Sequence, residues 1–139
     1  MQAEKKQANP RKAAIYCRVA STDERALEHQ RRSVSEFAAG QMYEDCAEYL
    51  DNGESGMTLD RPAFTRLRND IRTGKIDVVF VRDTSRIGRD MIQTLQWLDD
   101  MRTQGVRIIA MNEGVKLPYD FLEIFLPQKD RLPRTNPKA

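Results

Sequence analysis

An arginine and a serine that could act together on a phosphate group lie close together near the start of the chain. Arg18 interrupts the apolar run Ala13–Val19, and Ser21 follows that run. A guanidinium is almost never fully buried unless it is paired or bound to an anion. The pair is therefore typical of a phosphate-handling site at the end of a first strand. The alternatives are a buried ion pair of Arg18 with Asp51 or Asp77, and a helix-capping role for Ser21.

Two further arginines strengthen the phosphate interpretation. Arg86 and Arg89 are three residues apart, so a helical turn would place them on one face. They follow the apolar run 76–81, and Asp51 follows another. Because ligands of α/β sheets bind beyond the carboxyl ends of the strands, we expect these side chains to converge with Arg18. Several arginines near one hydroxyl fit a pentavalent phosphoryl intermediate, whereas ordinary surface charge is the alternative for the pair.

The elements that must position these residues alternate between strand and helix. The order β-α-β-α-β-α-β indicates an α/β fold, with a largely parallel sheet of four or five strands flanked by helices. The apolar runs predict strands at 13–19, 44–50, 76–81 and 106–111. The capping signals predict a helix over 23–39 capped by Thr22 or Asp23, one that starts at Asp60-Arg61-Pro62 with Asp60 as cap and ends at Gly74, and one over 91–105.

Length and charge are those of one soluble globular domain. The chain has 139 residues, of which 40% are hydrophobic and 32% charged, with a net charge of +2. That charge excludes binding of nucleic acid through overall basicity. Residues 61–89 nevertheless hold eight basic residues against three acidic ones, a stripe suited to a directed phosphate site. We expect a disordered basic lead-in over 1–11, the domain over 12–115 and a partly disordered tail over 116–139.

The sequence predicts neither a metal nor a cofactor. Cys17 and Cys46 are the only cysteines and His29 is the only histidine, so Cys and His cannot form a metal cluster. No glycine-rich phosphate loop follows the first strand, which argues against a flavodoxin-like nucleotide-binding domain. No apolar run approaches the length of a signal peptide or a membrane span. We therefore expect a cytoplasmic protein that does not contact a membrane.

A set of motifs resembles the catalytic domain of the serine recombinases, the resolvase/invertase family, and especially the large transposon and phage members. They occur in family order and spacing between about residues 13 and 113. The motifs are Tyr16-Cys17-Arg18-Val19 with Ser21, Gln30, Asp51-Asn52-Gly53-x-Ser55-Gly56, Asp60-Arg61-Pro62, Gly74-Lys75-x-Asp77, Ser85-Arg86-x-x-Arg89 and Gly105-Val106-Arg107. The resemblance implies a resolvase-like catalytic domain.

The resemblance also implies a reaction on double-stranded DNA that needs no metal or nucleotide cofactor. A serine hydroxyl attacks a backbone phosphodiester, a 5′-phosphoseryl link forms, and strands are exchanged within a tetramer. The family's catalytic residues correspond here to Ser21 as nucleophile, to Arg18, Arg86 and Arg89 as phosphate ligands, to Arg61 as an assisting group, and to Asp77 as a holder of the arginines. Its DNA-binding or supporting positions correspond to Asp51, Ser85 and Tyr16.

The chain departs from the family pattern at three points. Ala20 stands where the family usually places its serine, but Ser21 keeps the family distance to Gln30, so we assign Ser21 as the nucleophile. In strict register the nucleophile is absent, and the chain is a non-catalytic, truncated recombinase remnant that acts as an oligomerising or regulatory module. Ser85 stands before Arg86 where many relatives carry aspartate. The family's long helix and DNA-binding region have no counterpart after Glu113, so we expect a homo-oligomer, dimer or tetramer, in the full-length protein.

Overall fold

The computed structural model describes residues 12–112, so the predictions for 1–11 and for the tail lie outside the described residues. The strands are β1 (Ala13–Val19), β2 (Ala47–Asn52), β3 (Val78–Val81) and β4 (Arg107–Ala110). The helices are α2 (Glu24–Gly40), α3 (Pro62–Arg72), the short 3-10 helix η1 (Thr84–Arg86) and α4 (Met91–Thr103). This order confirms the predicted alternation of strands and helices.

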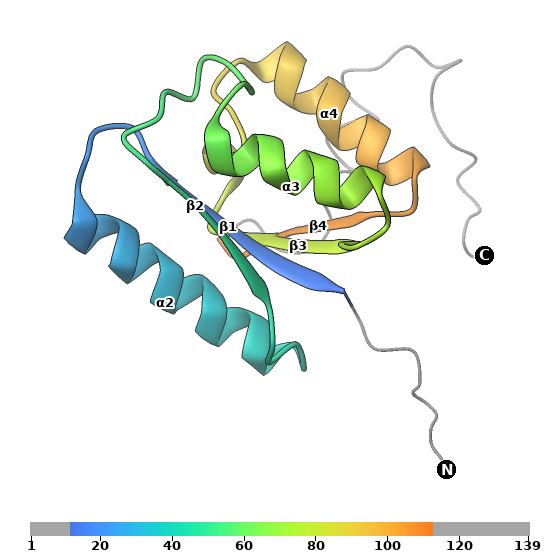
Figure 1. Cartoon of the computed structure of the whole chain (residues 1–139), viewed down its shortest axis with the longest axis horizontal. Helices are drawn as coiled ribbons and strands as arrows, with labels where there is room; N and C mark the ends of the chain where they lie inside the picture. The colour runs from blue at the N-terminus through green and yellow to red at the C-terminus, as the bar shows by residue number, and fades with distance from the viewer. Residues whose placement is uncertain (1–11, 113–139) are drawn as a thin grey trace.

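The four strands form one parallel sheet in the order β2-β1-β3-β4. Helix α2 covers one face of the sheet, and α3 and α4 cover the other (Figure 1). Because β1 is central and all strands run in the same direction, the segments that follow β1, β2 and β3 begin at one edge of the sheet. The predicted α/β class with a parallel sheet is confirmed.

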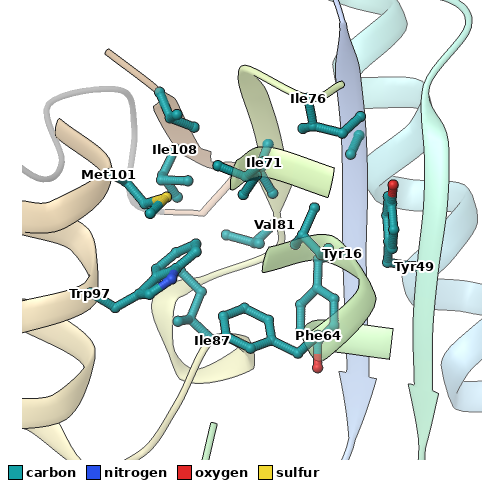
Figure 2. Packing of buried hydrophobic residues seen from close by; sticks show 14 of the residues in the cluster. Tyr16, Tyr49, Phe64, Ile71, Ile76, Val81, Ile87, Trp97, Met101 and Ile108 are labelled. Carbon is teal, nitrogen blue, oxygen red and sulfur yellow. The ribbon is translucent and has the colours of Figure 1, made fainter. Parts of the chain in front are cut away.

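The alternation of side chains along β1 divides the core into two clusters. Ala14 and Tyr16 pack with the residues under α3 and α4, whereas Ile15 and Cys17 pack with those under α2. On the α3 side, the Phe64 ring lies between Tyr16 and Trp97, with ring centroids 5.1 and 5.0 Å away (Figure 2). Every residue of β1 is buried, so the strand that carries Arg18 is held on both faces.

The structure corrects two predicted boundaries near the site. β2 spans 47–52 rather than 44–50, because Arg18 and Val19 of β1 pair with Asp51 and Asn52 and extend the strand. The predicted Asp60 cap of α3 is wrong, since the N-cap residue is Arg61 and its side chain makes no capping bond. The Asp51 side chain of β2 accepts from the N–H groups of the first turn of α3 instead.

The start of α2 agrees with its sequence signal. The Asp23 side chain accepts a hydrogen bond from the backbone N–H of Ala26, which makes Asp23 the cap and excludes Thr22 from that role.

Among residues 12–112, no helix combines the length and the apolar character needed to cross a membrane.

Candidate active site

The carboxyl edge of the sheet brings together most of the predicted site residues. Arg18 is the sixth residue of β1, Asp51 lies near the end of β2, and Ser85 and Arg86 belong to η1 just after β3. Figure 1 shows that the loop after β2 and the start of α2 lie at this same end of the sheet. Parallel strand ends are where α/β sheets bind ligands.

The Arg18 guanidinium is fully buried and is bonded to three backbone carbonyl oxygens. Its Nε donates to Arg86 O at 3.1 Å, its Nη1 to Glu54 O at 2.8 Å and its Nη2 to Ser85 O at 2.6 Å. Within the described residues Arg18 makes no ion pair with Asp51 or Asp77, so the ion-pair alternative is wrong. The side chain instead joins the end of β1 to the segments that follow β2 and β3.

Gln30 of α2 holds the backbone of Arg18. Its Oε1 accepts from Arg18 N–H and its Nε2 donates to Arg18 O, both at 3.1 Å. β3 pairs with β1 only as far as Tyr16, so the Gln30 amide takes the place of a neighbouring strand beyond that point. The sequence carried a signal for this role, because buried Gln30 shares the apolar face of α2 with Leu27 and Val34.

The Asp51 carboxylate connects β1, β2 and α3. It accepts a 2.6 Å hydrogen bond from the Tyr16 hydroxyl, and it also accepts the backbone N–H groups of Ala63 and Phe64 at 2.8 and 3.1 Å. Those N–H groups belong to the first turn of α3, so Asp51 caps the helix from a distance. Asp51 is 3% exposed. Tyr16 and Asp51 are therefore buried supports of the site and do not face solvent.

The buried Arg61 side chain connects the loop after β2 to η1 by hydrogen bonds. Its Nη1 donates to the Tyr16 hydroxyl and to Arg86 O, both at 3.0 Å, its Nη2 donates to Ile87 O, and its Nε donates to Thr58 O at 2.9 Å. Because the residue is only 1% exposed, its guanidinium stabilises the arrangement of these segments rather than lying free on a loop.

Arg86 and Arg89 are the arginines nearest to solvent in this cluster. The Arg86 side chain is 19% exposed, donates to Arg18 O at 3.2 Å and lies 3.8 Å from Asp83 Oδ1. Arg89 is exposed, and its backbone N–H donates to Gly56 O at 2.7 Å. Among the described residues, the Arg89 guanidinium has no bonding partner. These two side chains are the ones that an approaching anion can reach.

The cluster carries more positive than negative charge. Within residues 12–112, the contact of Arg86 with Asp83 is the one ion pair that Arg18, Arg61, Arg86 and Arg89 make. Burial, followed by the neighbouring Arg61 guanidinium, lowers the pKa of Arg18, and the charges of Arg86 and Arg89 act in the same direction. Like charges gathered in a poorly solvated place are costly unless an anion compensates them, so the cluster is suited to bind one.

The two serines of the site differ in what their hydroxyl groups contact. The Ser85 hydroxyl and backbone N–H both donate to Asp83 Oδ1. Ser21 is exposed in the turn between β1 and α2, and its hydroxyl has no partner among the described residues. That turn lies against the loop after β2, because Val19 O accepts from Gly53 N–H at 2.9 Å and from Glu54 N–H at 3.1 Å.

Asp77 is not part of this cluster. It precedes β3, and its backbone N–H donates to the carbonyl of Lys12, the residue before β1. In a parallel sheet, a residue before a strand lies at the amino edge, opposite to the edge that holds Arg18. The prediction that Asp77 holds the arginines in place is therefore wrong.

No group of three His, Cys, Asp or Glu side chains within residues 12–112 is arranged to hold a metal ion.

Comparison with known proteins places the chain in a family. Residues 13–128 match the family described as "Resolvase, N terminal domain". The N-terminal catalytic domain of TP901-1 integrase is 32% identical, with 73% of this chain and 79% of that chain covered and a TM-score of 0.68. A resolvase family site-specific recombinase from Streptococcus pneumoniae is 29% identical, with coverage of 81% and 80% and a TM-score of 0.68. The chain belongs to the resolvase family and has the fold of its catalytic domain.

Curated relatives agree with this assignment but are longer. The Transposon Tn3 resolvase of Escherichia coli is 29% identical over 76% of this chain, which spans 52% of that protein. A provisionally named DNA recombinase of Bacillus subtilis (strain 168) is 34% identical over 71% of this chain, which spans 20% of that protein. The resemblance read from the motifs is thus confirmed, for a segment that covers between a fifth and about half of these relatives.

Proposed function

We propose that this chain is the catalytic domain of a site-specific serine recombinase, which cleaves and rejoins double-stranded DNA through Ser21. One observation carries the proposal. Four arginines converge at the edge of the sheet where β1 ends, and the exposed, unpartnered hydroxyl of Ser21 follows β1 by two residues; the arginines make only one ion pair among the described residues. A phosphodiester supplies both the anion that this cluster lacks and the electrophile that a serine can attack.

The proposed step is a transesterification. Ser21 Oγ forms a bond to phosphorus and loses its proton, while the bond from phosphorus to the 3′ oxygen breaks and that oxygen gains a proton. The product is a 5′-phosphoseryl link and a free 3′-hydroxyl, and reversal of the same step joins strands. Charge accumulates on the phosphoryl oxygens in the transition state, where guanidinium donors stabilise it. Arg86 and Arg89 are exposed enough to act there, whereas Arg61, Tyr16 and Asp51 act through the segments they hold.

The hydrogen bonding of the serines supports Ser21 over Ser85. A nucleophile needs a hydroxyl with an open side, and the Ser85 hydroxyl is committed to Asp83. The competing function is the non-catalytic remnant, which rests on Ala20 at the position where the family usually has its serine. We further propose that strand exchange takes place in an assembly of several copies, as the recombination of two duplexes requires at least two sites.

The test is whether a covalent adduct forms between the protein and DNA. The chain is joined through a flexible linker to a DNA-binding domain of known target, so that the target raises the local DNA concentration. Plasmids carry two such targets around a randomised spacer, and adducts are trapped by denaturation with detergent. We expect an adduct with the wild-type chain and none with Ser21→Ala, while Ser85→Ala keeps it. Absence of any adduct over the whole spacer library favours the remnant.

A further inference from the structure

The loop of residues 53–58, here named the cover loop, lies over the Arg18 guanidinium. Alternate carbonyl groups of this loop accept from three arginines: Glu54 O from Arg18 Nη1, Gly56 O from the backbone N–H of Arg89, and Thr58 O from Arg61 Nε. Gly56 itself is buried although it lies in a loop. The cover loop is thus fastened to the arginine cluster through its backbone.

Gly56 is the point of closest approach between the cover loop and the arginines. A Cβ atom at this position would lie 2.7 Å from Arg18 Nη2, 3.0 Å from Arg18 Cζ and 2.9 Å from Arg89 Cγ. Real Cβ atoms essentially never show the two contacts below 3.0 Å, and the third is tighter than most real ones. The backbone of Gly56 is not in the left-handed region, so its lack of a side chain matters for space and not for conformation. A side chain here would force the loop and Arg18 apart.

With the cover loop in this position, Arg18 is not accessible to a phosphate. The Arg18 side chain is 0% exposed, and three of its five N–H donors are bonded to carbonyl oxygens. The two that remain, one on each Nη, have no route to solvent while the loop is closed. Exposed Arg89, in contrast, is accessible in the same state.

We propose that the cover loop is a latch, which closes on Gly56 and keeps Arg18 inaccessible until a phosphate group displaces the Glu54 carbonyl. This role of the latch rests on the proposed function, because the phosphate in question is that of the DNA substrate. A substrate would first meet Arg89 and Arg86, and Arg18 would join them when Glu54 O is released. The latch lowers the apparent affinity for phosphate by the fraction of molecules in which it is open.

The experiment compares Gly56→Ala with the wild-type chain in the absence of DNA. Arginines are modified with phenylglyoxal and the rate at each arginine is measured by peptide mass spectrometry. We expect rapid modification of Arg89 and slow modification of Arg18 in the wild type, and a rise of roughly tenfold at Arg18 in Gly56→Ala. Gly40→Ala is the matched control, since a Cβ there meets no atom within 4 Å. An unchanged Arg18 rate in Gly56→Ala overturns the latch.

Two further measurements separate the latch from loss of the fold. Cys17 is fully buried on the neighbouring position of β1, so its alkylation by iodoacetamide reports global unfolding. If Gly56→Ala exposes Cys17, the variant is globally unfolded, and the urea dependence of the two reactions in the wild type is used to test for local opening. Local opening predicts that Arg18 modification depends little on urea while Cys17 alkylation depends on it steeply. Equal urea dependence of the two reactions contradicts local opening.

The last arm tests whether the latch controls phosphate binding. Inorganic pyrophosphate is titrated against both chains by calorimetry at one salt concentration. We expect Gly56→Ala to bind several-fold more tightly, because more molecules are open before the ligand arrives. Equal or weaker binding shows that the loop does not act as a latch. Failure of the DNA adduct experiment would instead refute the proposed function and leave these results standing.

Discussion

The Tyr16 hydroxyl donates a 2.6 Å hydrogen bond to Asp51 Oδ2, and this carboxylate also caps α3. A strand at the centre of the sheet, its neighbour and a helix on the surface of the sheet therefore depend on one buried anion. Arg61 joins the same group by donating to the Tyr16 hydroxyl at 3.0 Å. The buried polar contacts among Tyr16, Asp51 and Arg61 thus position the segments that carry the other arginines. Substitutions in this group should therefore change the stability of the domain.

Asp51→Asn should destabilise the fold strongly. The amide presents an N–H₂ group to at least one donor that the carboxylate now satisfies, and it removes the charge that faces the first turn of α3. We expect a loss of about 2–3 kcal/mol in the free energy of unfolding, measured by urea denaturation. The matched control is Asp70→Asn, because Asp70 also accepts a 2.6 Å bond from a tyrosine, Tyr49, but is half-buried. Equal losses in the two variants would argue against a special role for Asp51.

The stability of the domain should fall at alkaline pH. Burial, followed by the hydrogen bond with Asp51, raises the pKa of Tyr16 far above its usual value of 10.0. Burial and the bond with Asp70 raise the pKa of Tyr49 to about 12. Above pH 10 the unfolded chain loses protons that the folded chain keeps, so the free energy of unfolding decreases as pH rises from about 10 to 12.

Tyr16→Phe provides the check on this dependence. The variant lacks the most strongly shifted hydroxyl, so its urea midpoint should start lower but decline less steeply above about pH 10. Urea midpoints of the wild type and the variant at four pH values between about 9 and 11.5 measure both slopes. Parallel curves would mean that Tyr16 does not titrate differently in the folded and unfolded chains.

Asp77→Asn should leave the reaction unchanged. Asp77 is exposed at the amino edge of the sheet, opposite to the arginines, and a surface change of this kind alters stability by less than about 0.5 kcal/mol. The yield of covalent DNA adduct and the binding of pyrophosphate should both match the wild type. A large loss of adduct with no change in the urea midpoint would restore the role that the family resemblance gave to this residue.

The sequence was sufficient to predict the fold and the edge of the sheet at which the candidate site lies. Apolar runs and caps identified all four strands, and the strand-end rule placed Arg18, Ser21 and Arg86 at one edge. Asp77 lies at the beginning of the predicted strand 76–81, so the same rule places it at the other edge, and only the family resemblance assigns it a role beside the arginines.

The partners of the buried polar groups could not be predicted from the sequence. Arg18 bonds to carbonyl oxygens, and every backbone residue carries one, so no residue type marks those contacts. Asp51 caps α3 because the path of the loop brings β2 and the helix together, while Asp60, in the expected position, makes no such bond. Gln30 is the exception, since a polar residue among apolar neighbours on a helix face is a visible signal.

Gln30→Met should destabilise the fold strongly, although the two side chains are similar in size. Methionine keeps the length of the side chain but leaves both the N–H and the carbonyl of Arg18 unsatisfied in the core. We expect a loss of about 2–4 kcal/mol in the free energy of unfolding. Gln96→Met on the exposed face of α4 is the control and should change the stability by less than about 0.5 kcal/mol. Similar losses in both variants would show that the bonds to Arg18 contribute little.

The central claim is that Ser21 is the nucleophile although Ala20 stands at the position where the family usually has its serine. The direct measurement is mass spectrometry of the peptide that retains the nucleotide after the trapped adduct is digested with nuclease and protease. We expect a nucleotide on Ser21 in the wild-type chain and no adduct with Ser21→Ala. We also expect that the double variant Ala20→Ser/Ser21→Ala, which moves the hydroxyl by one residue, forms much less adduct. An inert wild type together with an active double variant would contradict the assignment, and so would a nucleotide attached to Ser85.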